Sequence, residues 1–215
     1  MRHRVFITGG TGYIGSRLIP LLAARGHEVI ALVRPGSERK LPPGCTPVLG
    51  DALDGATYAQ HVGSCDTFVQ LVGVAHPSPA KAKEFVAIDQ KSALAAIRAA
   101  KAAGIAHFVY GSVAHPAPAM YAYIAARTVC EDELQDSGMN ATILRPWYVL
   151  GPGHWWPYFL IPFYWIAERI PSKRESALRL GLVTIDQMLK ALVNAVDRPA
   201  RGIKIVEVPA IRAAD

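Results

Sequence analysis

The sequence predicts an α/β fold in which helices cover both faces of a doubly wound, mostly parallel sheet. Three observations predict it. Strand-like and helix-like segments alternate along most of the chain, one strand candidate is apolar throughout, and a glycine-rich turn joins the first strand candidate to the first helix candidate. Such βαβ units favour parallel strands because their crossovers are right-handed. With 215 residues, 51% of them hydrophobic, the chain suits a single domain over residues 1–215.

The expected elements follow from local patterns taken in order along the chain. Residues 4–8 are a short β-rich run, and residues 13–25 repeat apolar side chains at helical spacing. Residues 28–33 form a continuous apolar run, which is typical of a strand buried on both faces. Further strands are expected at 46–49, 67–72, 106–110 and 141–145, and further helices at about 55–62, 79–103 and 119–137.

The last third of the chain departs from this alternation. Residues 147–180 are rich in aromatic residues and proline, and we expect an irregular insertion there with one helix near 158–169. A final helix is expected to begin near Thr184, because Thr184 and Gln187 have the spacing of a capping box. A last strand is expected at 203–208. We interpret the insertion as the substrate region of the single domain.

Composition and charge argue against several classes of function. The net charge is +6, but no run of Lys and Arg is long enough for a nucleic-acid-binding arm, so no nucleic-acid partner is expected. Neither the three cysteines nor the seven histidines have metal-ligand spacing, so we expect no metal site, no disulfide framework and a reduced, cytoplasmic setting. Residues 146–167 are uncharged, but prolines and glycines interrupt them, so no transmembrane span is expected.

A glycine-rich loop follows the first strand candidate and opens the first helix candidate. Residues 8–15 read TGGTGYIG, with glycine at every third position from Gly9 to Gly15. Such a loop turns tightly and lets the backbone approach a pyrophosphate, while free N–H groups at the helix start face the phosphates. It predicts a Rossmann-type NAD(P) site; a glycine turn without a ligand is the alternative. The residues expected at the cofactor here are Gly9, Thr11, Gly12, Tyr13, Ile14 and Gly15.

The end of the second strand candidate indicates which dinucleotide to expect. An NAD-selective site usually has Asp or Glu there to hold the adenosine ribose, but this strand ends in Ala-Leu-Val-Arg. Arg34, with Arg39 and Lys40 nearby, could instead pair with a 2′-phosphate. We therefore expect NADP in preference to NAD, with a solvated arginine as the alternative for Arg34. Asp51 could contact the adenine amino group or could serve only as a turn residue.

Five segments together match the pattern of one superfamily. They are the glycine loop and the runs PVLGD at 47–51, VQLVGVA at 69–75, FVYGS at 108–112 and TILRP at 142–146. On these segments the whole chain resembles the extended and atypical short-chain dehydrogenase/reductases, and most resembles the NmrA-like regulators and NAD-dependent epimerase/dehydratases. The resemblance implies a doubly wound fold with a small C-terminal substrate region. It also places at the cofactor Ala52, Leu71, Val72, Gly73, Pro146, Trp147 and Val149.

The same resemblance assigns candidate catalytic residues, because a Ser and a Tyr-x-x-x-Lys pair carry the chemistry of that superfamily. Ser112 would orient a carbonyl or hydroxyl group, and Tyr123 would be the general acid/base. Arg127 stands where the pattern has Lys, on the same helical face as Tyr123. A tyrosine, with a pKa of about 10, needs a nearby cation to act near neutrality. Arg is a cation but longer and planar. In the alternative, Tyr123 only packs and Arg127 only tethers the cofactor.

An aromatic segment at residues 154–165 reads HWWPYFLIPFYW, which is too many large rings for a solvent-exposed loop. The segment could line an apolar substrate pocket, form a homodimer interface or rest on a membrane surface. We favour the pocket, with Trp155, Trp156 and Phe159 in contact with a small apolar substrate such as a quinone, a terpenoid or a lipid-like ketone.

These observations lead to one preferred function and two alternatives. The preferred function is an NADP-preferring oxidoreductase that passes a hydride between the nicotinamide and a small apolar carbonyl or alcohol. One alternative is a redox sensor or assembly factor that binds NAD(P) without turnover, as the resemblance to NmrA-like proteins implies. The other is a sugar-nucleotide epimerase or dehydratase, which the shortage of polar and basic groups in the aromatic region disfavours.

Overall fold

The computed structural model describes residues 2–153 and 156–214, and their central element is a seven-stranded sheet in the order β3-β2-β1-β4-β5-β6-β9. Every pair of neighbouring strands in this sheet is parallel. The strands are β1 (Arg4–Thr8), β2 (Glu28–Val33), β3 (Cys45–Leu49), β4 (Thr67–Gln70), β5 (His107–Gly111), β6 (Ala141–Arg145) and β9 (Ile203–Glu207). The strand order reverses direction between β1 and β4, which is the position where doubly wound sheets bind their ligands.

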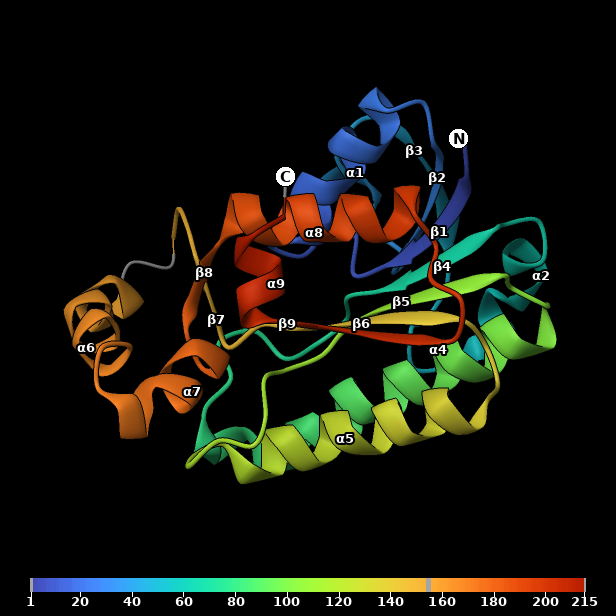
Figure 1. Ribbon diagram of the computed structural model, residues 1–215. Coiled ribbons are helices and arrows are strands. Elements are labelled where there is room, and N and C mark those ends of the chain that lie inside the picture. Colours follow the sequence, from blue (N-terminus) through green and yellow to red (C-terminus); the bar gives the residue numbers. More distant parts are fainter. Residues whose placement is uncertain (1, 154–155, 215) are drawn as a thin grey trace.

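Helices cover both faces of this sheet, as Figure 1 shows. Side chains of β1 point alternately to the two faces, so Val5 and Ile7 pack in one hydrophobic cluster and Phe6 packs in the other. The first cluster includes α1 (Gly15–Ala24) and α8 (Ile185–Asp197). The second includes α2 (Ala59–Val62), α4 (Lys91–Ala102) and α5 (Tyr121–Asp136). This is the doubly wound Rossmann fold that the sequence predicts.

The helix expected at 79–103 is interrupted. It begins with a 3₁₀ turn (Pro79–Lys81) and a short helix α3 (Ala82–Glu84), continues as a π-helical segment η4 (Phe85–Gln90) and becomes regular only in α4. Such π segments are rare and often lie at functional sites. The capping box at the start of α8 is confirmed, because Thr184 and Gln187 exchange both side-chain-to-backbone hydrogen bonds.

The aromatic insertion expected at 147–180 is more regular than predicted, because it contains a strand near its start and a second helix near its end. β7 (Tyr148–Leu150) pairs in parallel with β8 (Leu182–Thr184) in a separate two-stranded sheet. Between them a 3₁₀ segment η5 (Trp156–Leu160), α6 (Ile161–Ala167) and α7 (Pro171–Arg179) form a lobe at one end of the molecule (Figure 1). We call residues 158–179 the α6–α7 lobe. A short helix α9 (Val208–Arg212) follows β9.

Among the residues that the structure describes, no helix combines the length and the apolar character needed to cross a membrane.

Candidate active site

The glycine loop between β1 and α1 is packed so closely that two positions exclude any side chain. Gly9 has φ +76°, and a Cβ there would lie 2.8 Å from the carbonyl carbon of Leu71. A Cβ on Gly15 would collide with the carbonyl oxygen of Gly9. The loop therefore rests directly on the end of β4 and brings the first turn of α1 against it. This is the geometry that a pyrophosphate-binding loop requires.

A cleft of about 460 Å³ lies beside this loop, between the ends of β1, β2 and β4. Its volume is within the usual range of small-molecule sites. Many of the residues predicted to contact the cofactor line it, namely Gly9, Thr11, Gly12, Arg34, Asp51, Ala52, Leu71, Val72 and Gly73. The lining also includes residues that sequence reasoning did not assign to the site, among them Ser37, Lys81, Glu84 and Ile88. The cleft thus lies where the strand order reverses, next to backbone that only glycine allows.

Arg34 and Asp51, the two polar residues from which dinucleotide recognition was predicted, both line the cleft. Arg34 is exposed, and no ion pair involving it is found among the described residues. Asp51 lines the cleft, but its Oδ1 also accepts a hydrogen bond of 2.9 Å from the backbone N–H of Leu53. Asp51 therefore serves as a turn residue and also faces the cleft.

The other residues predicted at the cofactor are not among the described residues that line the cleft. Ile14 and Gly15 start α1, and the Tyr13 ring lies 4.2 Å from the guanidinium of Arg17. After β6, Pro146 accepts a hydrogen bond of 2.9 Å from the backbone of Ala114. The Trp147 ring contacts Tyr148 at 5.6 Å, and Val149 pairs with Val183 in the small sheet.

Arg127, the predicted substitute for lysine, is buried against Gly73, one of the residues that line this cleft. Its Nη2 lies 2.5 Å from Oδ1 of Asp89, and its Nη1 donates a 2.5 Å hydrogen bond to the carbonyl oxygen of Gly111. A Cβ on Gly73 would lie 2.5 Å from Nη2, so the guanidinium lies directly against the backbone of that residue. Because an arginine stays protonated in proteins, the pair is a buried cation beside a buried carboxylate. The guanidinium of Arg127 therefore links Gly111, at the end of β5, to Gly73 in the loop that lines the cleft.

Tyr123 lies one turn before Arg127 on α5, and its ring centre is 5.1 Å from the guanidinium carbon. On its other side the ring contacts Phe85 of the π segment at 4.9 Å. Burial raises the pKa of Tyr123, and the charge of Arg127 only partly opposes this rise. The phenol therefore keeps its proton at neutral pH.

Ser112 is also close to this group, since it follows Gly111 directly. Its buried hydroxyl donates a hydrogen bond to Glu131, a carboxylate that is only 1% exposed. Glu131 is also paired with Arg145, and Nε2 of His115 lies 3.6 Å from its Oε2. Arg127 thus contacts both Tyr123 and the residue before Ser112. Two acids that the sequence analysis did not name, Asp89 and Glu131, pair with Arg127 and Ser112. Glu131 follows Arg127 by one helical turn, a spacing that could have indicated it.

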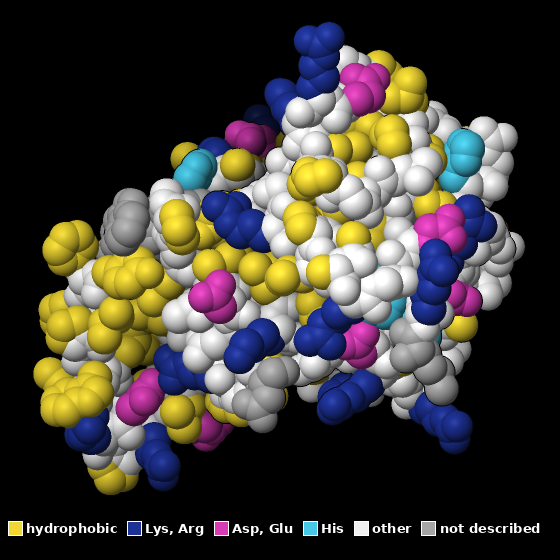
Figure 2. Space-filling view, turned by 90° about the horizontal axis from the view of Figure 1, so that it is seen from above, with side chains coloured by type: hydrophobic (Ala, Val, Ile, Leu, Met, Phe, Trp, Pro, Cys, Tyr) yellow, Lys and Arg dark blue, Asp and Glu magenta, His cyan; other side chains and the backbone are white. Residues whose placement is uncertain are grey.

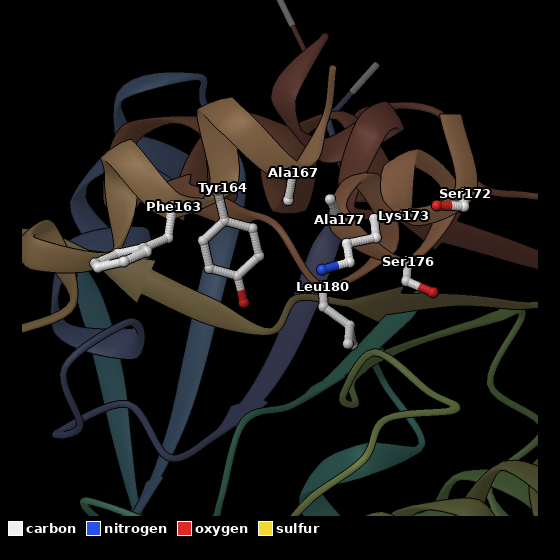
Figure 3. Close-up of a pocket in the computed structure, with 8 residues that line it drawn as sticks. All are labelled: Phe163, Tyr164, Ala167, Ser172, Lys173, Ser176, Ala177 and Leu180. Atoms are coloured by element: carbon white, nitrogen blue, oxygen red, sulfur yellow. The ribbon is translucent and has the colours of Figure 1, made fainter. Parts of the chain in front are cut away.

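A second cavity of about 320 Å³ lies within the α6–α7 lobe. Figure 3 shows the residues that line it, which are Phe163, Tyr164, Ala167, Ser172, Lys173, Ser176, Ala177 and Leu180. Phe159, predicted to contact substrate, is 79% exposed and is not one of them. Trp155 lies outside the described residues, and of Trp156 only the backbone position in η5 is described.

Comparison with known proteins agrees with the fold and the cleft, which define a dinucleotide-binding protein. Residues 9–151 match the family model described as NAD(P)H-binding. The chain therefore belongs to the NAD(P)H-binding family, and its cofactor is NAD(P). The glycine loop fits that group because its backbone leaves no room for side chains at Gly9 and Gly15.

Individual relatives include both reductases and epimerases. The chain is 26% identical over 204 residues to a ceramide reductase of Caulobacter vibrioides, a match that covers 94% of this chain and 63% of that protein. It is 30% identical over 124 residues to a UDP-glucose 4-epimerase of Klebsiella pneumoniae, covering 52% and 89%. The Bordetella bronchiseptica enzyme WbmH in complex with NAD⁺ aligns with a TM-score of 0.71 and 25% identity, over 96% of this chain and 76% of that one.

The chain spans less than two thirds of the length of several curated relatives that it matches, and the ceramide reductase is one of them.

Proposed function

We propose that this protein is an NADP-preferring carbonyl reductase that acts on a small apolar substrate. The observation on which the proposal depends is the position of Tyr123 beside the buried cation of Arg127, which lies against Gly73 in the lining of the dinucleotide cleft. Burial raises the pKa of Tyr123, so the side chain is a proton donor at neutral pH. A proton donor suits reduction of a carbonyl better than oxidation of an alcohol, which needs a base.

Each residue of the group has a role in this proposal. The nicotinamide cofactor, which the glycine loop and the cleft would hold, would supply the hydride for the carbonyl carbon. Tyr123 gives its proton to the carbonyl oxygen, so that C=O becomes CH–OH and the tyrosinate is stabilised by Arg127 until it regains a proton from water. Ser112 aligns the same oxygen when its hydroxyl turns from Glu131 toward the substrate. Positioning of the two reactants provides much of the acceleration.

Arg34 supports the preference for NADP. It is exposed at the rim of the cleft, and among the described residues its guanidinium is not engaged in an ion pair. A guanidinium in that state can form a bidentate contact with a phosphate.

The α6–α7 lobe supports an apolar substrate. Its cavity is lined largely by aromatic and aliphatic side chains, and Figure 3 shows the side chain of Lys173 extending between Tyr164 and Leu180. Such a lining favours a carbonyl compound with an apolar body over a diphosphate sugar, which needs several cationic groups. The ceramide reductase, which aligns with most of this chain, is by its name a reductase of a lipid.

A binding protein without turnover is the second candidate, and one observation favours it. The charge of Arg127 is already paired with Asp89, and the hydroxyl of Ser112 is already donated to Glu131. Both groups would then hold the cofactor and the fold without acting on a substrate.

The test is NADPH consumption by the purified protein with a panel of apolar ketones, aldehydes and quinones, set beside conversion of UDP-glucose. The proposal expects turnover with at least one apolar carbonyl and no epimerisation of UDP-glucose. Epimerisation without net NADPH consumption would overturn it in favour of a sugar-nucleotide enzyme. Tight NADPH binding with no turnover across the panel would favour the binding protein.

A further inference from the structure

The α6–α7 lobe exposes a concentration of large apolar side chains that the rest of the described surface lacks. Figure 2 shows them gathered at one end of the molecule. Phe159, Phe163 and Trp165 are 79%, 69% and 58% exposed, respectively. With Tyr158, Ile161, Ile166 and Ile170 they form what we call the apolar face. Soluble monomers rarely leave such a patch in water unless it serves an interaction.

The apolar face extends around much of α6 rather than along one stripe. Ile161, Phe163, Trp165 and Ile166 are all exposed, although they point in different directions around a helix of seven residues. Only Tyr164 of this helix packs against the hydrophobic core. A helix with this distribution is more suited to immersion in an apolar medium than to packing on a single partner surface.

The charged side chains around the apolar face are mostly basic. Arg169, Lys173 and Arg174 are exposed on the lobe, and the guanidinium of Arg169 lies 3.4 Å from the ring centre of Trp165. The acids of the lobe are already paired, because Glu168 lies 2.9 Å from Arg212 and Glu175 lies 3.2 Å from Arg179. The complementary surface is therefore anionic.

We propose that the apolar face docks on the surface of an anionic lipid bilayer. The aromatic and aliphatic side chains enter the boundary between headgroups and acyl chains, and the basic side chains remain among the anionic headgroups. Trp165 and Tyr158 are the residue types that membrane interfaces enrich. A second copy of the chain fits the face less well, because a twofold contact would bring two cationic rims together.

This proposal goes beyond the reductase activity and needs no substrate for its test. The experiment is flotation of the purified protein with vesicles of phosphatidylcholine alone and with vesicles in which about one third of the lipid is phosphatidylglycerol. The protein is expected to float with the anionic vesicles and to be released by high salt. Absence from the anionic vesicles, or equal binding to both kinds, would overturn the proposal.

Two variants and one control locate the contact. Trp165→Ser with Ile166→Ser is expected to lower partitioning at least about tenfold, because both substitutions remove apolar surface that would leave water on docking. Arg169→Glu with Arg174→Glu is expected to lower binding to anionic vesicles by a similar factor. Val129→Ser removes a side chain that is 43% exposed on α5, and it should change nothing.

NADPH titration of each variant separates loss of docking from loss of fold, because the cleft is formed by other elements. Sedimentation velocity tests whether a second copy of the chain covers the apolar face instead. If the apolar variant abolishes a dimer that forms in solution and leaves vesicle flotation unchanged, the face is a dimer interface and the lipid proposal is wrong.

Discussion

Asp89 and Arg127 form a buried ion pair against the loop that lines the dinucleotide cleft, with Oδ1 of the acid 2.5 Å from Nη2 of the arginine. The second carboxylate oxygen of Asp89 accepts a 3.0 Å hydrogen bond from the backbone N–H of Val74, which lines the cleft. One acid in the π segment therefore holds both the cation of α5 and the loop after β4. The proposed proton donor, Tyr123, depends on the same pair because Arg127 lies against its ring.

Removing one member of this pair should destabilise the fold strongly. Asp89→Asn or Arg127→Met alone is expected to lower the free energy of unfolding by about 3–5 kcal/mol, because the other charge stays buried without a partner. The double variant should lose less than the sum of the two single losses. Urea denaturation of the four proteins measures this coupling. Simple additivity would show that the two charges do not interact.

The glycine loop gives a test of close packing. Gly15→Ala should lower stability by about 2 kcal/mol and weaken NADPH binding, since its Cβ would collide with the backbone of Gly9. Gly63→Ala is the matched control, because Gly63 has helical angles and nothing lies within 4 Å of its added Cβ. The control should be neutral or gain up to about 1 kcal/mol. Thermal unfolding and calorimetric titration measure both effects. Equal behaviour of the two variants would contradict the loop's proposed role.

The preference for NADP depends on Arg34. Arg34→Ala is expected to weaken NADPH binding by about 1–2 kcal/mol, or about 5- to 30-fold, and to leave NADH binding unchanged, because only NADPH carries the 2′-phosphate. Arg98→Ala, an exposed arginine on α4, controls for the loss of one positive charge. Parallel titrations with both nucleotides decide the point. An equal loss for NADH would assign Arg34 to a contact that both nucleotides share.

His107 should make the protein sensitive to mild acid. Its ring is 1% exposed, and burial lowers its pKa to about 4. Between about pH 6.5 and pH 4 the unfolded chain binds a proton that the folded chain does not, so stability should fall by about 3 kcal/mol as the pH falls through that window.

His107→Gln, which can still reach Thr142, should flatten this part of the stability profile relative to the wild type. His76→Gln, which replaces an exposed histidine, is the control and should leave the slope of the wild-type profile unchanged. Chemical denaturation at a series of pH values measures the slopes. Parallel profiles for the wild type and His107→Gln would show that His107 is not the group responsible.

Local patterns were sufficient to predict much of the fold and the cofactor cleft. The glycine loop is defined by residues close together in the sequence, and the steric demands at Gly9 and Gly15 are purely local. The main strands follow from short apolar runs bounded by turns. β7 and β8 could not be predicted in the same way, because each has three residues and they pair across more than thirty residues of sequence.

The candidate catalytic group was only half predictable. Arg127 could be assigned from its spacing to Tyr123, but its partner Asp89 lies on another element, in a π segment that an alanine-rich sequence does not indicate. The hydrogen bond from Ser112 to Glu131 likewise depends on how β5 packs against α5. The exposure of Phe159 and its neighbours could not be predicted either, because aromatic composition fits a pocket and a surface equally well.

Replacement of Tyr123 by phenylalanine tests the central claim most directly. With an apolar carbonyl substrate found in the panel, Tyr123→Phe should lower kcat at least about 100-fold, the scale of a lost general acid, while the affinity for NADPH stays the same. The measurement is NADPH consumption under saturating conditions, with Tyr121→Phe, the exposed tyrosine at the start of α5, as the control. A variant that keeps most of its turnover would contradict the role of Tyr123 as the proton donor.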